Sequence, residues 1–233
     1  MSDNTTNKQS GFLGNLAFNI IIPVLILTNL NGDDRLGPAW SIVAALAFPI
    51  AYGLWDLKQS GKVNGFSILG IVSVFLTGGI TLLELPAEYI AIKEATIPAV
   101  LGLAVLFTQR TSKPLLKVLV LNEQIVNWEN LSKALKVNNK TAEFEQKMAI
   151  SSYIVAASFF LSSALNYILA KVILVSAPGT TEYTEELGHM TALSYPVIVI
   201  PSMLMLMGAL WYLFAQIKKL TGEDLDNFLH GAQ

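Results

Sequence analysis

The chain has 233 residues, of which 53% are hydrophobic and only 14% are charged, and its mean hydropathy is +0.53. This composition leaves too little polar surface to cover a soluble globular protein of this length. The sequence contains no Cys, which excludes a disulfide framework, a thiol nucleophile and a thiolate metal site.

Six long apolar stretches follow one another along the chain. A helix rising about 1.5 Å per residue needs about 20 residues to cross a hydrocarbon core of roughly 30 Å, and five of the stretches meet this length. The fourth has 15 residues, so it reaches that length only if Tyr89–Glu94 continues it, which puts Lys93 and Glu94 in the headgroup layer. The uncharged runs are Gln9–Gly32, Leu36–Trp55, Val63–Leu83, Ala95–Gln109, Met148–Ala170 and Met190–Ile217.

The runs predict an all-α integral membrane protein with six transmembrane helices in three consecutive hairpins, because backbone groups in lipid must be satisfied within each segment. A polar N-terminal tail (1–13) precedes the transmembrane domain (14–220), and a C-terminal tail (221–233) follows it. A cytoplasmic amphipathic connection (110–145) joins the fourth and fifth helices. The expected helices span about 14–31, 38–56, 65–84, 89–109, 146–176 and 190–217.

Lys and Arg are distributed unequally between the two ends of these helices. With six crossings, the N-terminus, the second and fourth connections and the C-terminus share one side, which holds 12 of the 15 basic residues. The other side holds Arg35 and Lys93, and Lys171 lies within the fifth helix. Because cytoplasmic loops are enriched in Lys and Arg, both termini are expected in the cytoplasm. Residues 1–13 lack the features of a signal peptide, so the first helix is expected to remain as an anchor.

The connection 110–145 begins with an amphipathic segment that Pro114 can open as a helix. Two basic residues, Lys113 and Lys117, lie beside its apolar face. The segment is therefore expected to lie in the inner headgroup layer and to bind anionic lipid headgroups. The apolar face consists of Leu115, Leu116, Leu119 and Val120.

Small and polar residues recur every four positions on several helices, which indicates faces turned towards other helices. Thr77 belongs to such a stripe on the third helix and Asn166 to one on the fifth, and Asn19 precedes Pro23 on the first. For Asn166, a structural hydrogen bond and a contact to a substrate or ion are both open. Lys171 can snorkel to the interface, form a pair with Glu84, Glu94 or an outer-loop acid, or serve transport.

A second group of candidates lies at the expected outer ends of the helices. His189 has no neighbouring His or Cys, so a metal site is not expected, and no cofactor is expected either. Each inward-going helix carries a Pro, which fits either three parallel repeats or the ordinary ends of membrane helices. The outer-mouth candidates are Glu84, Lys93, Glu94 and His189, and the expected kinks are Pro23, Pro49, Pro98, Pro196 and Pro201.

Motifs of known enzyme classes are absent from the sequence. It has no Gly-x-Ser-x-Gly elbow, no His-Glu-x-x-His, no phosphate-binding Gly-Lys-Ser/Thr loop and no GxGxxG. The acids Asp56, Glu84 and Glu94 all fall at helix ends, whereas a proton-driven pump is expected to keep an acid at mid-depth. We therefore expect no catalytic activity and no nucleic-acid partner.

The second hairpin and part of the fifth helix contain a series of short elements with a recognisable pattern: Thr81-Leu82-Leu83, Tyr89-Ile90-Ala91-Ile92-Lys93, Thr96-Ile97, Leu101–Gln109, Lys113-Pro114-Leu115 and Ala164-Leu165-Asn166-Tyr167. This pattern resembles the bacterial intracellular septation protein A family, the YciB-like inner-membrane proteins. The likeness covers residues 38–120 best and 157–220 less well, and the chain departs from the family pattern in a longer insertion at 121–147 and in Glu94. The chain therefore resembles a distant relative of this family more than a true member.

This resemblance implies a multi-pass protein of the bacterial inner membrane that acts in envelope maintenance or division. Its partners would be envelope or division proteins, or a second copy of the chain. A scaffold or accessory factor without catalytic activity is the first functional hypothesis. The alternative is a small transporter or channel, which would show a water-accessible path lined by the Asn166 and Thr77 stripes.

Overall fold

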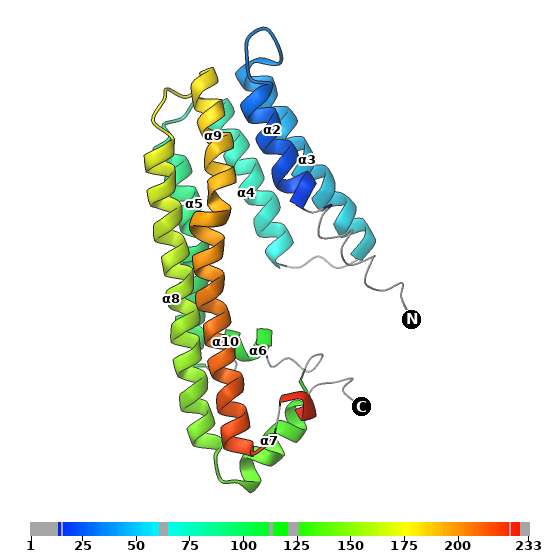
Figure 1. Cartoon of the computed structure of the whole chain (residues 1–233), viewed down its shortest axis with the longest axis vertical. Helices are drawn as coiled ribbons and strands as arrows, with labels where there is room; N and C mark the ends of the chain where they lie inside the picture. The colour runs from blue at the N-terminus through cyan, green and yellow to red at the C-terminus, as the bar shows by residue number, and fades with distance from the viewer. Residues whose placement is uncertain are drawn as a thin grey trace. The chain divides into compact units, whose positions relative to one another are not determined.

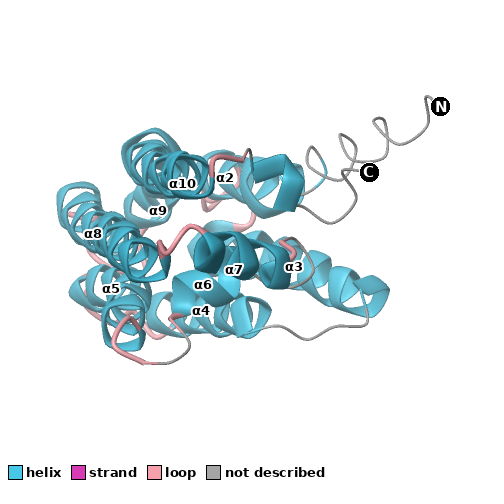
Figure 2. Ribbon diagram, turned by 90° about the horizontal axis from the view of Figure 1, so that it is seen from below, coloured by secondary structure: helices cyan, strands magenta, loops and turns pink. Residues whose placement is uncertain are grey.

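A computed structural model describes residues 14, 16–60, 65–111, 114–120, 126–223 and 225–228, and their regular structure is helical (Figure 2). Four helices are long and apolar enough to cross a membrane: Gly37–Trp55, Glu88–Thr108, Thr141–Ile173 and Thr181–Thr221. Two shorter apolar helices, Ala17–Asn29 and Val72–Leu82, correspond to the first and third predicted crossings. The all-helical class is thus confirmed for this part of the chain, and the number of crossings remains a prediction.

The chain divides into two compact units. Unit 1 comprises Met1–Ala95 and Leu165–Val197, and unit 2 comprises Thr96–Ala164 and Ile198–Gln233. Their boundaries fall inside the helices α5 (Glu88–Thr108) and α8 (Thr141–Ile173) and inside a π-helix, η2 (Tyr195–Val199).

In unit 1, a π-helix, η1 (Ala17–Ile21), continues into α2 (Ile22–Asn29), and α3 (Gly37–Ser60) and α4 (Gly65–Leu82) follow (Figure 1). The first turns of α5 and the last turns of α8 also belong to this unit, and α9 (Thr181–Ser194) completes it. Thr180 caps α9, because its hydroxyl accepts a hydrogen bond of 3.2 Å from the Tyr183 N–H.

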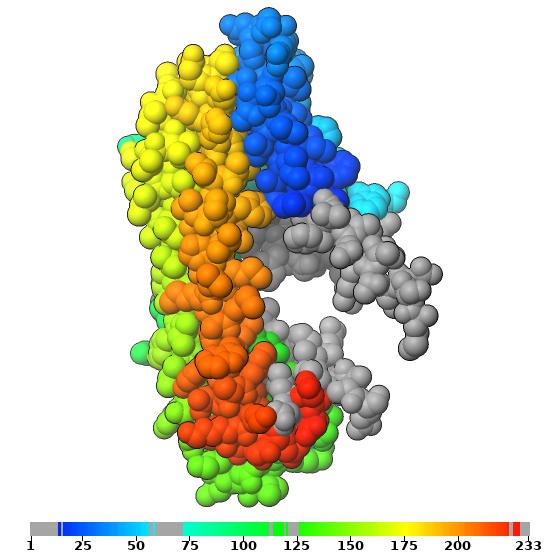
Figure 3. Space-filling view, viewed as in Figure 1, coloured from blue at the N-terminus to red at the C-terminus, as the bar shows by residue number. Residues whose placement is uncertain are grey.

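The helices α2 and α9 pack closely against each other (Figures 1 and 3). Gly188 allows this approach, since a Cβ atom at this position would lie 2.8 Å from Thr28 Cγ2 and 3.0 Å from Leu27 Cβ. The Asn31 side chain, which is buried after the end of α2, donates a hydrogen bond of 3.0 Å to the Thr181 carbonyl. Close packing of small residues and hydrogen bonds of this kind hold helices together in lipid, where the hydrophobic effect does not.

In unit 2, three short helices pack with α8 and α10 (Ile200–Thr221) around one apolar core. They are α6 (Leu115–Val120), α7 (Trp128–Val137) and the 3₁₀-helix η3 (Leu225–Phe228), and we call them together the inner cap. The core includes Leu116, Leu131, Phe144, Leu213 and Phe228. Leu116, from the apolar face predicted for the connection 110–145, is thus part of this core, and contact of the segment with lipid headgroups remains a prediction.

The inner cap is also held by polar contacts at its helix ends. The Asn127 side chain accepts from the Asn130 N–H and so caps α7, while the Asn127 N–H donates to the Phe228 carbonyl at 2.7 Å. The Asn138 side chain, just after α7, donates to the carbonyls of Leu220 and Thr221. Phe228, in the segment predicted only as a C-terminal tail (221–233), therefore contributes to the core.

Two helix starts precede their expected positions. α8 begins at Thr141 instead of about 146, and α9 begins at Thr181, whereas the sixth helix was expected from about 190. The residues before Met190 are mostly polar, so their low hydropathy indicates contact with water. Hydropathy does not distinguish a helix in water from a loop. The cap at Thr180 and the acid Glu182 in the first turn favour a helix there regardless of hydropathy.

Both π-helices lie beside prolines that were expected to kink their helices. Pro23 is the second residue after η1, Pro196 lies within η2 and Pro201 is the second residue after η2. A proline has no N–H to bond the carbonyl four residues earlier, and this missing bond favours a locally widened turn. Pro49 and Pro98 lie inside α3 and α5, which continue through them as α-helices.

Candidate functional site

A buried lysine forms the polar centre of unit 1. Lys93 lies five residues into α5, and its side chain is only 7% exposed. Its Nζ donates to Ser73 Oγ at 3.1 Å and to Thr77 Oγ1 at 2.6 Å, both on α4, and lies 2.6 Å from Glu94 Oε1. We refer to Lys93, Glu94, Ser73 and Thr77 as the lysine cluster.

The lysine cluster satisfies the ammonium group fully. An ammonium has three N–H donors and no acceptor, and Lys93 has three oxygen partners, one from each of the other cluster residues. The Thr77 hydroxyl donates its own proton to the Ser73 carbonyl at 3.0 Å, so its oxygen is free to accept from Lys93. A charge that would be costly in an apolar setting is therefore compensated by an opposite charge and by hydrogen bonds.

The local sequence explains how α4 and α5 assemble this cluster. Ser73, Thr77 and Thr81 recur every four residues and share one face of α4. A short turn follows, and α5 returns in the opposite direction. Thr77 and Lys93 stand eight residues before and after Leu85, so the hairpin brings them to the same level. The polar stripe on α4 thus faces the lysine on α5.

The second predicted basic residue, Lys171, forms an ion pair with Glu88. Its Nζ lies 2.9 Å from Glu88 Oε1, and the two side chains are 43% and 69% exposed. Snorkelling and pairing were separate alternatives for Lys171. The structure shows pairing, with an acid at the start of α5, and snorkelling to a membrane interface remains a prediction. The partner is Glu88, and Glu94 pairs instead with Lys93.

The four outer-mouth candidates occupy different places in unit 1. Lys93 and Glu94 belong to the lysine cluster. Glu84 has a positive φ of 53° in the turn after α4, and its carboxyl group lies 2.7 Å from where a Cβ of Gly179 would be. His189 is exposed on α9, next to the close-packed Gly188. The structure therefore brings together Thr77, Lys93 and Glu94, which the sequence assigned to two separate groups.

The two predicted amides lie in different helices. Asn19 is part of η1 and Asn166 of α8, and both side chains are half-buried. Neither is without an interaction partner.

In the inner cap, Lys117 contacts an aromatic ring. Its Nζ lies 3.6 Å from the centre of the Trp128 ring, a cation–π geometry. Partial burial lowers the pKa of Lys117, and the nearby Glu145 carboxylate opposes this shift. Trp128 also packs against Phe144, with their ring centres 6.2 Å apart. This lysine, predicted to pair with lipid, thus has a partner within unit 2; Lys113 lies outside the described residues.

Several of these features were missed from the sequence, although some had a detectable signal. Thr77 was recognised as part of a polar stripe on the third helix, and counting residues outward from the turn would have paired this stripe with Lys93. The partner of Lys171 carried no comparable signal, since α5 and α8 are far apart in the sequence. Within the described residues, no three His, Asp or Glu side chains form a group that could hold a metal ion.

Comparisons with protein-family models, curated proteins and solved structures gave no match to this chain.

Proposed function

We propose that this chain crosses a bacterial inner membrane six times, with both termini in the cytoplasm. Four helices of sufficient length and hydropathy support four of the crossings, and the apolar helices that contain Ala17–Asn29 and Val72–Leu82 would supply the other two. The excess of Lys and Arg on one side supports the orientation. On the cytoplasmic side, these basic residues would also contact anionic lipid headgroups.

The orientation can be tested with single cysteines, because the natural chain has none. Asp34, Val137 and Glu182 are exposed positions suited to replacement by Cys. A membrane-impermeant thiol reagent added to intact cells should label positions 34 and 182 and spare position 137. Position 137 should react once the cells are permeabilised, which controls for accessibility. Labelling of 137 alone in intact cells would mean the opposite orientation.

We further propose that the protein is a membrane scaffold or accessory factor without catalytic activity, acting through envelope or division proteins or a second copy. One observation carries this proposal: all three donors of the Lys93 ammonium are bound within unit 1. A lysine that binds a substrate needs donors to offer, whereas a saturated lysine joins two helices. The resemblance to the septation protein A family supports a role in the envelope.

The scaffold hypothesis can be tested by replacing the buried ion pair with neutral residues. In a strain that lacks the protein and has an envelope or division defect, Lys93→Met/Glu94→Gln should restore wild-type growth when it accumulates in the membrane at the wild-type level. The matched control is Glu129→Gln/Lys133→Met, which neutralises an exposed pair on α7. Loss of rescue by the first variant alone, at equal membrane levels, would contradict a purely structural lysine.

A transporter is the second candidate, because Lys93 and Glu94 form an ion pair within a helix of membrane-crossing composition. Ionisable residues in such helices often belong to ion or proton pathways. If the protein is a transporter, it should dissipate a proton or solute gradient when purified and placed in liposomes, and Lys93→Met should abolish this activity. Gradient retention equal to that of protein-free liposomes would favour the scaffold.

A further inference from the structure

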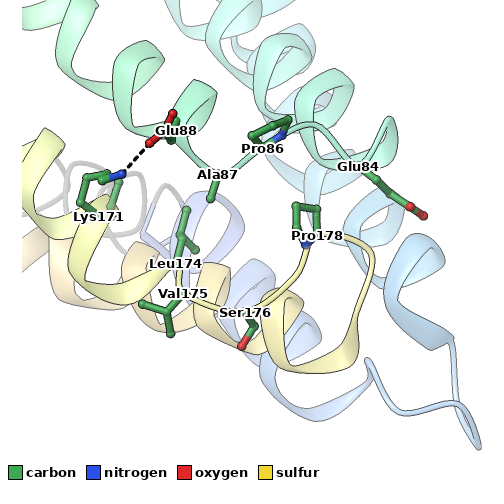
Figure 4. A pocket seen from close by; sticks show the side chains of 10 residues that line it. Glu84, Pro86, Ala87, Glu88, Lys171, Leu174, Val175, Ser176 and Pro178 are labelled. Carbon is green, nitrogen blue, oxygen red and sulfur yellow. Dashed lines mark hydrogen bonds and ion pairs between the residues drawn. The ribbon is translucent and has the colours of Figure 1, made fainter.

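A cleft of about 380 Å³ lies in unit 1 between the start of α5 and the end of α8 (Figure 4). Its walls are mainly apolar, with Ala87, Leu174 and Pro178 among them, and Leu174 is only 5% exposed. The Glu88–Lys171 ion pair spans the cleft between the two helices. A negative and a positive group are thus held side by side over an apolar floor.

The two charges are fixed at helix ends that favour them. Glu88 lies in the first turn of α5, where the positive end of the helix dipole stabilises an anion. Lys171 lies in the last turn of α8, where the negative end stabilises a cation. Each group therefore keeps a favourable environment when the other moves away. Exposed ion pairs contribute little to stability, so this one can open readily to bind a ligand.

The surface around the cleft is apolar to a degree unusual for a surface in water. Leu83, Val172 and Val175 are 71%, 65% and 75% exposed. Exposed apolar side chains beside charged groups are characteristic of the boundary between headgroups and acyl chains. The cleft also lies at the ends of two helices of membrane-crossing length. These features favour a lipid over a ligand dissolved in water.

We propose that this cleft binds the headgroup of a zwitterionic phospholipid that carries both a phosphate and an ammonium group. The Lys171 ammonium takes the phosphate, and the Glu88 carboxylate takes the ligand ammonium, so that both charges exchange one partner for another. The exposed apolar side chains contact the upper acyl chains. This inference rests on the proposed membrane orientation, which puts the cleft in the outer headgroup layer, and it is independent of the scaffold role.

The proposal can be tested with the full-length, delipidated protein in detergent. Native mass spectrometry would give dissociation constants for dihexanoyl phosphatidylethanolamine and dihexanoyl phosphatidylglycerol, which differ in the ammonium group. The wild type should prefer the ethanolamine lipid by roughly tenfold, the value of one charge-assisted hydrogen bond. Glu88→Gln should remove this preference and leave phosphatidylglycerol binding unchanged. Lys171→Met should weaken binding of both lipids by roughly tenfold.

The controls separate this cleft from unspecific lipid binding. Glu129→Gln and Lys133→Met alter an exposed ion pair elsewhere and should leave both dissociation constants unchanged. Equal binding of the two lipids by the wild type, or wild-type binding by both cleft variants, would overturn the proposal. If free phosphoethanolamine binds as tightly as the lipid, the ligand is a soluble compound and the lipid assignment is wrong. Because binding is measured in detergent, failure of the scaffold proposal would not alter these results.

Discussion

The lysine cluster allows a quantitative prediction for Thr77. Replacing Thr77 with Val keeps the shape of the side chain and removes the oxygen that accepts a 2.6 Å hydrogen bond from Lys93. Hydrogen bonds to charged groups contribute about 1.5–3 kcal/mol in proteins generally. Measured values between membrane helices are lower, at about 0.6–1.7 kcal/mol. We therefore expect Thr77→Val to lower the free energy of unfolding by about 1–2 kcal/mol.

The same substitution should be nearly neutral when Lys93 is first replaced by Met. Without the ammonium, the Thr77 hydroxyl has only its bond to the Ser73 carbonyl in its own helix. A bond from a hydroxyl to the carbonyl four residues earlier contributes little to helix stability. Its loss should therefore change the free energy of unfolding by at most about 0.5 kcal/mol. The double-mutant cycle should therefore give a coupling energy of about 1–2 kcal/mol between Thr77 and Lys93.

Reversible unfolding in mixed micelles with increasing sodium dodecyl sulfate would measure these free energies. Thr191→Val is a matched control, because the Thr191 hydroxyl is half-buried and donates to the Leu187 carbonyl of its own helix at 2.9 Å. It should change stability by less than about 0.5 kcal/mol in either Lys93 background. A coupling energy below about 0.5 kcal/mol for the Thr77 cycle would refute the view that the cluster joins α4 and α5.

Three further predictions use the same unfolding assay. Gly188→Ala should destabilise the protein by about 1–3 kcal/mol, because its Cβ would meet α2, whereas Gly208→Ala has open space and should be neutral or stabilising; equal effects would contradict the close packing. Phe228→Ala should cost about 3–5 kcal/mol because the ring is 2% exposed, while Val137→Ala, at an 85% exposed position, should have little effect; a neutral Phe228 variant would mean that η3 does not support the core. Gly179→Ala should cost about 1–2 kcal/mol, since its φ of +84° is unfavourable for Ala, and unchanged stability would argue against this turn.

The sequence predicted the all-helical class because long apolar runs have few other solutions in lipid. It placed α3 and α5 to within a residue or two at their first residues, where charged or turn-forming residues bound the runs. It was less informative at the start of α9, where polar residues form a helix. Hydropathy indicates whether a segment contacts lipid or water, and a polar segment in water can be a helix or a loop. Local capping at Thr180 was the better indicator there.

The arrangement of polar groups was predictable only where the chain folds back locally. Thr77 and Lys93 are joined by one short turn, so their meeting follows from helix spacing and hairpin geometry. The pairing of Lys171 with Glu88 depends on which helices become neighbours, and a single sequence does not contain that information. The same applies to the inner cap, where Leu116 shares one apolar core with residues of α7 and η3.

The contact between Asn127 and Phe228 also bears on how the protein is made. These residues are about a hundred positions apart, and the chain emerges from the ribosome with its N-terminal part first. α7 therefore has its own capping residue from the start but lacks one of its core partners until synthesis reaches Phe228. Closure of the inner cap would thus come about a hundred residues after α7 has been made.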